Sequence, residues 1–246
     1  MRVGRPGTWL EISDRPGVHP VDPFAGRAAR RLPVRAGDRV LDLGCGTGVY
    51  GLAAAALGAA RVVLTDVDGR AIRCARDNAR RNGLSNVQCL AGDMFEPCGE
   101  ERFDLIVASL PQTPGPVPFR LAKWGGADGT LHLRRLIREA PRHLSAGGKL
   151  FFILHDLSHT RRIRRLLARR FRTRVALRVQ RRFTPTEYDG LLPGLFAYLD
   201  RLRRRGWSRF HGRREDLWFH LRFIVATLKG RPRRCVPRRC PPARTP

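Results

Sequence analysis

Between residues 38 and 156 the chain alternates short apolar runs with longer stretches in which apolar residues recur every three to four positions. The short runs are apolar on consecutive positions, which is typical of parallel strands covered by helices on both faces. This alternation predicts an α/β fold, a doubly wound and mostly parallel sheet. The expected strands are 39–43, 61–65, 87–90, 103–108 and 149–155, and the expected helices are 49–57, 69–82 and 131–144.

The alternation continues after residue 156 with many more basic positions. It predicts a helix over 160–171, a strand over 173–179, a helix over 186–205 and a long strand over 217–228. Residues 230–246 contain five prolines and show no periodicity, which predicts a disordered basic tail. The expected organisation is therefore an N-terminal segment over 1–37, one domain over 38–229 and a tail over 230–246.

The charge is unevenly distributed along the 246 residues. The chain has 48 Lys+Arg and 21 Asp+Glu, a net charge of +27. Residues 157–246 carry +21 of it, whereas 1–156 carry only +6. Clustered arginines near Trp207, Phe210 and Trp218 predict either an RNA-binding surface or an ordinary solvated face, and both interpretations stay open.

Other function classes are disfavoured. The first 25 residues lack the apolar core of a signal peptide, and the longest apolar stretch, 52–60, is too short to span a bilayer. The six cysteines form no CxxC pair and no zinc spacing with histidine, so no metal site is expected. We therefore expect a cytoplasmic protein without a membrane partner.

A glycine-rich turn follows the first predicted strand, in the segment VLDLGCGTGVY over 40–50. Gly44, Gly46 and Gly48 let the backbone turn sharply and approach a ligand, and the following helix presents unpaired N–H groups there. The spacing G-x-G-x-G puts Val49 where a dinucleotide fingerprint needs glycine, and no Gly-Lys-Ser/Thr follows. The turn therefore disfavours NAD, FAD and a Walker loop.

Two acids follow the next strands. Asp66 ends the second strand about 20 residues after the glycine turn, where a carboxylate can accept both ribose hydroxyls. Asp93 follows the third strand, where it could meet an adenine amino group while Met94 packs on the ring. Either acid alone could instead cap a helix, but the ordered set of turn, Asp66 and Asp93 favours a nucleoside site.

The segments VLDLGCGTG, LTDVD, AGDMF and FDLIVASLP together resemble the class I S-adenosylmethionine-dependent methyltransferases, over roughly residues 20–156. The resemblance implies a Rossmann-like, seven-stranded sheet with its last strand antiparallel, and S-adenosyl-L-methionine as the cofactor across the strand C-termini. It implies that Asp42, Gly44, Gly46 and Gly48 surround the methionine part, Asp66 the ribose, and Asp93 with Met94 the adenine.

The segment after the fourth strand, together with 125–129, resembles the release-factor glutamine methyltransferases and related small-domain methyltransferases. Those families carry Asn-Pro-Pro-Tyr where this chain has Ser109-Leu110-Pro111-Gln112. The aromatic platform for a planar amide or nucleobase is therefore replaced by Gln112. We expect Ser109 and Gln112 to orient the acceptor.

Two further sets of residues are candidates for the acceptor site. His155 ends the fifth strand, where it could act as a general base, with His19 as a weaker candidate. The Pro/Gly-rich lead over 15–24 could cover the cofactor or could simply wrap the surface. Residues 184–216 lie between the last two strands and are expected to form a substrate lid.

Three functions follow from the sequence. The leading hypothesis is methyl transfer to a nitrogen or oxygen of a small biosynthetic acceptor, because the acceptor motif is altered and no recognition domain precedes the fold. The alternative is a methyltransferase acting on a protein side chain of the glutamine type or on RNA. The third is a non-catalytic scaffold that binds the cofactor.

Overall fold

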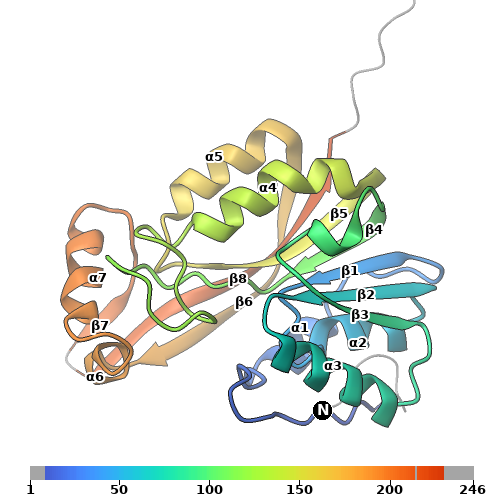
Figure 1. Ribbon diagram of the computed structural model, residues 1–246. Helices are drawn as coiled ribbons and strands as arrows, with labels where there is room; N and C mark the ends of the chain where they lie inside the picture. Colours follow the sequence, from blue (N-terminus) through green and yellow to red (C-terminus); the bar gives the residue numbers. More distant parts are fainter. Residues whose placement is uncertain (1–8, 214, 230–246) are drawn as a thin grey trace, which may run out of the picture.

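The computed structural model describes residues 9–213 and 215–229 and contains one eight-stranded sheet at its centre (Figure 1). The strand order is β3-β2-β1-β4-β5-β8-β6, and the short β7 pairs with β8 outside this path. The strands are β1 (Arg39–Leu43), β2 (Arg61–Asp66), β3 (Val87–Ala91), β4 (Phe103–Ala108), β5 (Leu144–His155), β6 (Phe171–Phe183), β7 (His211–Arg213) and β8 (Asp216–Leu228).

The sheet is parallel from β3 to β5 and becomes antiparallel where β8 inserts between β5 and β6. This confirms the expected doubly wound, mostly parallel fold with an antiparallel last strand. Seven strands form the expected path, and β7 is an eighth strand that was not predicted. The predicted tail over 230–246 lies outside the described residues.

Helices cover both faces of the sheet. The helices α1 (Ala25–Ala29), α2 (Val49–Ala56) and α3 (Gly69–Arg81) lie on one face, and α4 (Leu131–His143) and α5 (Thr160–Arg170) lie on the other (Figure 1). Each face has its own buried core, because consecutive strand residues point to opposite sides. Val40 belongs to the first core and Leu41 to the second. This double burial explains why β1, β2 and β4 carry apolar residues on consecutive positions.

The segment over 184–216 differs from its prediction. The single helix expected over 186–205 is wrong: α6 (Pro185–Asp189) and α7 (Leu195–Arg204) are separate helices. Pro193 cannot donate a backbone hydrogen bond, and Gly194 has a φ of +76° at the start of α7, so the helical path breaks between them. Within the part of the chain that the structure describes, no helix is long and apolar enough to cross a membrane.

Candidate functional site

The glycine turn lies between β1 and α2 and has the backbone that its residues predict. Gly44, Gly46 and Gly48 all have positive φ, at +66°, +55° and +84°. A Cβ on Gly44 would lie 3.1 Å from Cδ2 of Leu110, the residue that follows Ser109 after β4. The glycine turn and the predicted acceptor loop therefore touch each other at the C-terminal edge of the sheet.

Asp66 holds the glycine turn in place. Its Oδ2 accepts a hydrogen bond from the Gly46 amide at 2.9 Å, and its Oδ1 accepts one from the Asp68 amide at 2.9 Å. Burial raises the pKa of the Asp66 carboxyl, although these amides favour its charged form. A carboxylate oxygen can accept more than one hydrogen bond, so the side chain retains capacity for a ribose diol.

Asp42 and Tyr50 place two unsatisfied oxygens beside the turn. Asp42 is fully buried and its Oδ2 accepts a hydrogen bond from the Gly51 amide at 2.8 Å. Among the described residues, neither Asp42 Oδ1 nor the Tyr50 hydroxyl has a hydrogen-bond partner. Buried polar atoms are rarely left unpaired in a folded protein. Their presence beside a positive-φ glycine cradle fits a ligand with an ammonium group, such as S-adenosylmethionine.

Burial, with a smaller contribution from the nearby Asp66, raises the pKa of Asp42 to about 7. A cationic group bound next to Asp42 would favour its ionised form. Tyr50 was not singled out from the sequence. The signal was a hydroxyl within an otherwise apolar helix start, directly after the glycine turn.

Asp93 and Met94 lie at the end of β3. Asp93 is half-exposed and forms an ion pair with Arg135 of α4. Met94 has a φ of +53°, and its carbonyl accepts a hydrogen bond from the Thr65 hydroxyl at 3.2 Å. The Met94 side chain is buried in the second core. Contacts of both residues with adenine stay predictions.

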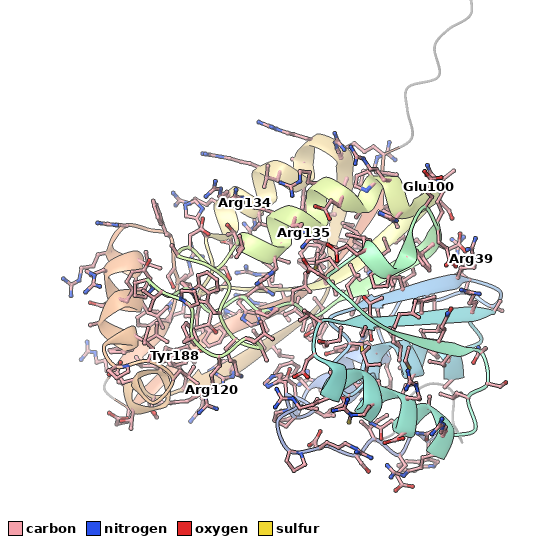
Figure 2. All side chains as sticks on the ribbon, in the orientation of Figure 1. Arg39, Glu100, Arg120, Arg134, Arg135 and Tyr188 are labelled. Carbon is pink, nitrogen blue, oxygen red and sulfur yellow. The ribbon has the colours of Figure 1, made fainter. Side chains whose placement is uncertain are left out.

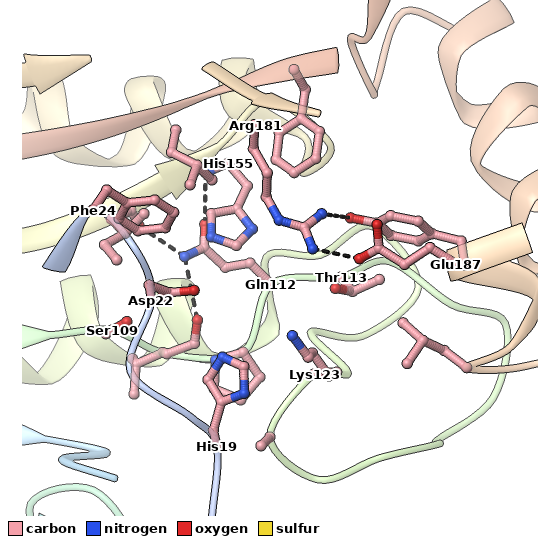
Figure 3. A pocket seen from close by; sticks show the side chains of 18 residues that line it. His19, Asp22, Phe24, Ser109, Gln112, Thr113, Lys123, His155, Arg181 and Glu187 are labelled. Atoms are coloured by element: carbon pink, nitrogen blue, oxygen red, sulfur yellow. Dashed lines mark hydrogen bonds and ion pairs between the residues drawn. The ribbon is translucent and has the colours of Figure 1, made fainter. Parts of the chain in front are cut away.

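A cavity of about 180 Å³ lies next to the predicted acceptor loop (Figure 3). Ser109 and Gln112 line it, as do His155 and His19, so the structure brings the sequence-predicted acceptor residues together. The segment over 184–216, which was expected to form a lid, contributes Tyr188 and Leu191 to the cavity wall. The Pro/Gly-rich lead over 15–24 contributes His19, Asp22 and Phe24.

Gln112 is fully buried, and both ends of its amide are engaged by backbone. Its Nε2 donates to the Ile153 carbonyl at 2.8 Å and to the Leu110 carbonyl at 3.3 Å, and its Oε1 accepts from the His155 amide at 3.1 Å. The side chain therefore fastens the acceptor loop to β5. These contacts make Gln112 a positioning residue, and its direct contact with an acceptor stays a prediction.

The cavity lowers the pKa of both histidines. Burial, together with the nearby Arg181, Lys123 and His19, lowers the pKa of His155 to about 3. Burial also lowers the pKa of His19. His155 can accept a hydrogen bond at neutral pH, but its low pKa makes it a weak general base.

The cavity contains four charged residues that were not predicted as site residues: Asp22, Lys123, Arg181 and Glu187. Arg181 forms an ion pair with Glu187 and donates to the Tyr188 hydroxyl at 3.3 Å (Figure 3). Asp22 and Lys123 make no side-chain hydrogen bond or ion pair within the described residues. Burial raises the pKa of Asp22 and lowers that of Lys123. One sequence signal was present: Lys123 is one of only three lysines among 48 basic residues.

The loop that carries Lys123 folds back against the acceptor loop. The Thr113 amide donates to the Lys123 carbonyl at 2.9 Å, and the Gly125 amide donates to the Thr113 carbonyl at 2.8 Å. A Cβ on Gly125 would lie 2.6 Å from the Gln112 Cα. The glycines of 125–129 thus allow two loop backbones to meet, which places the Lys123 ammonium in the cavity.

Comparisons with known proteins agree with this arrangement. A family model described as "Methyltransferase small domain" matches residues 17–185. A release factor glutamine methyltransferase of Geobacter sulfurreducens is 36% identical over 144 residues, which cover 54% of this chain and 50% of that protein. A ribosomal protein L11 methyltransferase of Pelotomaculum thermopropionicum is 49% identical over 78 residues, 31% of this chain and 25% of that protein. The chain thus spans half or less of the length of these relatives.

A solved structure of a methyltransferase from Pyrococcus furiosus shares the fold, with a TM-score of 0.59 and 22% identity. The match covers 90% of this chain and 89% of that one.

Proposed function

Because the chain belongs to the methyltransferase small domain family, we propose that it is an enzyme that transfers the methyl group of S-adenosylmethionine to a side-chain nitrogen of a protein, foremost an amide of the glutamine type. The observation that carries the proposal is the cavity that adjoins the glycine turn and contains polar side chains without partners among the described residues. Two relatives bear names of protein methyltransferases, which supports a protein acceptor.

The glycine turn and its acids would hold the cofactor, which when bound supplies a methyl group on an electrophilic sulfonium. The Asp66 carboxylate would accept the ribose hydroxyls while keeping its hydrogen bond to Gly46. Asp42 Oδ1 and the Tyr50 hydroxyl would gain the partners that they lack. These residues hold and orient the cofactor, and they take no part in proton transfer.

The cavity side chains would orient the acceptor. Methyl transfer is an in-line displacement, so the alignment and desolvation of the nitrogen contribute most to the rate. The Lys123 ammonium can donate to a carbonyl oxygen of the acceptor, while the Ser109 hydroxyl and the Asp22 carboxylate can accept from its nitrogen. Asp22 is also a better proton acceptor than His155, because burial raises its pKa.

A small-molecule acceptor is the second candidate, although the comparisons lend it no support. The observation in its favour is that His19, Asp22 and Phe24 form part of the cavity wall. A protein side chain would have to pass these residues, whereas a small acceptor could be enclosed by them.

The proposal is tested with methyl-labelled S-adenosylmethionine, the purified chain and a cell extract separated into protein, RNA and small-molecule fractions. We expect label in the protein fraction. Label only in the small-molecule fraction would establish the second candidate instead, and label only in RNA would contradict both. A protein that binds the cofactor but labels no fraction would be the non-catalytic scaffold.

A further inference from the structure

The α5 helix and the edge strand β6 together carry eleven arginines and no acid. Only three of these arginines form an ion pair with a carboxylate among the described residues, with Asp128, Glu187 and Asp216 as partners. The other eight are Arg161, Arg164, Arg165, Arg169, Arg170, Arg172, Arg174 and Arg178. Blue nitrogen ends project from α5 away from the sheet in Figure 2.

An arginine-rich composition does not by itself explain this excess. On the opposite face of the sheet, α3 carries five arginines, and three of them pair with Asp68, Asp77 and Glu11. The charge of the arginines is thus largely paired with acids on α3 and largely unpaired on α5 and β6. The side with the unpaired charge is an electropositive surface that fits a polyanion.

A cleft of about 310 Å³ opens between α5, β6 and β8. Its apolar part comes from Leu154, Leu167 and Ile224, and its basic part comes from arginines. These arginines are Arg164, Arg174 and Arg222. The cleft can therefore accommodate an apolar group next to a negatively charged one.

Arg222 lines this cleft with its charge balanced by Asp156, so the unpaired charge here comes from Arg164 and the neighbouring Arg178. Arg222 is buried, and its guanidinium pairs with Asp156, with Nη1 at 2.5 Å from Oδ1 and Nη2 at 2.8 Å from Oδ2. Burial lowers the pKa of Arg222, and Arg164 and Arg178 lower it further by repulsion. The three guanidinium groups lie close enough to oppose one another, so a bound anion would relieve this repulsion.

Aromatic rings continue the surface along β8. The residues Trp218, His220 and Arg222 alternate on β8 and therefore share one face of the sheet. On β6, Arg178 is opposite Arg222, and Arg182 is opposite Trp218. From Arg222 to Trp218 the strand spans about 13 Å.

Two contacts hold the Trp218 and His220 side chains of β8 in place. The ring of His211 on β7 stacks on Trp218 with centroids 4.4 Å apart. Arg178 Nη2 lies 3.0 Å from His220 Nδ1. Rings that alternate with guanidinium groups are the elements that stack bases and contact phosphates in proteins that bind single strands.

We propose that this surface, the arginine face formed by Arg164, Arg178, Arg182, Trp218, His220 and Arg222, binds single-stranded RNA. An unpaired strand exposes the base faces that such rings stack on, whereas a duplex keeps its bases stacked inside the helix. A membrane is a poor fit, because the apolar side of α5, with Ile163 and Leu167, is already buried in the core. This binding is independent of the proposed methyl transfer.

The test is fluorescence anisotropy of a labelled single-stranded RNA with the full chain, without cofactor, over a series of salt concentrations. The double variant Arg164→Glu/Arg178→Glu reverses two charges on the arginine face. We expect it to weaken binding by at least about 10-fold and to reduce the steepness of the salt dependence. The matched control Arg73→Glu/Arg76→Glu changes net charge equally on exposed positions of α3, and should weaken binding no more than about 3-fold.

A second variant, Trp218→Ala, leaves the charge unchanged. It should weaken RNA binding by about 5- to 100-fold with the same salt dependence, because a stacking surface is lost. Equal weakening by the face variant and its control would overturn the proposal, since net charge alone would then explain binding. Tighter binding of equal-length DNA, polyglutamate or anionic vesicles than of RNA would also overturn it.

Discussion

Asp42 and Tyr50 each bring a buried oxygen to the glycine turn that no described residue satisfies. A native protein keeps such an atom at a cost, because desolvation is not offset by a hydrogen bond. The cost is offset when a ligand supplies the partner. At the scale of single residues, this is the most direct structural indication that the glycine turn is a binding site and not only a tight connection.

The titration of Asp42 gives the first prediction. Burial holds its pKa at about 7 without ligand, so at about pH 6 the carboxyl is mostly protonated. Binding of a cationic cofactor favours the ionised form and releases a proton, so cofactor affinity should rise between about pH 6 and pH 7.5. Asp42→Asn should bind more weakly with a flatter profile, measured by calorimetry. Parallel profiles for the two proteins would show that Asp42 does not titrate with binding.

Lys123 gives the second prediction. Lys123→Met keeps the length of the side chain and removes its charge. Methyl transfer should fall about 10- to 100-fold, because a hydrogen bond from a charged donor is lost, while cofactor affinity should stay within about 3-fold. The control is Lys149→Met, which lies on β5 outside the cavity lining. Equal activity of the Lys123 variant and wild type would remove Lys123 from the acceptor site.

At the scale of elements, the two loops after β4 depend on glycine. A Cβ at Gly125 would lie 2.6 Å from the Gln112 Cα and 2.9 Å from the Pro111 carbonyl oxygen. Gly125→Ala should therefore displace the acceptor loop, lower stability by about 1–3 kcal/mol and abolish most methyl transfer. A Cβ at Gly69 would have Arg73 Nη1 as its nearest atom, at 3.6 Å, so Gly69→Ala should be tolerated. Urea unfolding and the labelled-methyl assay measure both effects.

The strands β1 to β4 and the helices α2 to α5 could be predicted from the sequence to within one or two residues, whereas β5 and β6 are longer than predicted and β7 was not predicted. Consecutive apolar positions indicate a strand that is covered by helices on both faces. The position of Asp66 was predictable because it closely follows such a run. The break between α6 and α7 was missed because amphipathic spacing continues across Gly194. The cavity charges were missed for a different reason: Asp22, Lys123 and Arg181 come from segments far apart in the chain, and only tertiary packing brings them together.

At the scale of the whole molecule, the excess of arginines has an energetic consequence. On α5, Arg161, Arg165 and Arg169 are spaced four residues apart and repel one another. Arg165→Glu should raise the free energy of unfolding by about 0.5 kcal/mol at low salt, and the gain should shrink as salt screens the charges. Urea unfolding at two salt concentrations measures this difference. An unchanged or lowered stability at low salt would contradict the repulsion.

The functional interpretation of the glycine turn and of the cavity depends on one claim: this chain binds S-adenosylmethionine through Asp66 and the glycine turn. Calorimetric titration of the cofactor into the purified protein tests it most directly, with Asp68→Asn as the control for a neighbouring acid that caps α3. We predict saturable binding by the wild type and the control, and a loss of at least about 10-fold in affinity for Asp66→Ala, because that variant loses hydrogen bonds to the ribose and to Gly46. No binding by the wild type at millimolar cofactor, or full affinity in Asp66→Ala, would contradict the account.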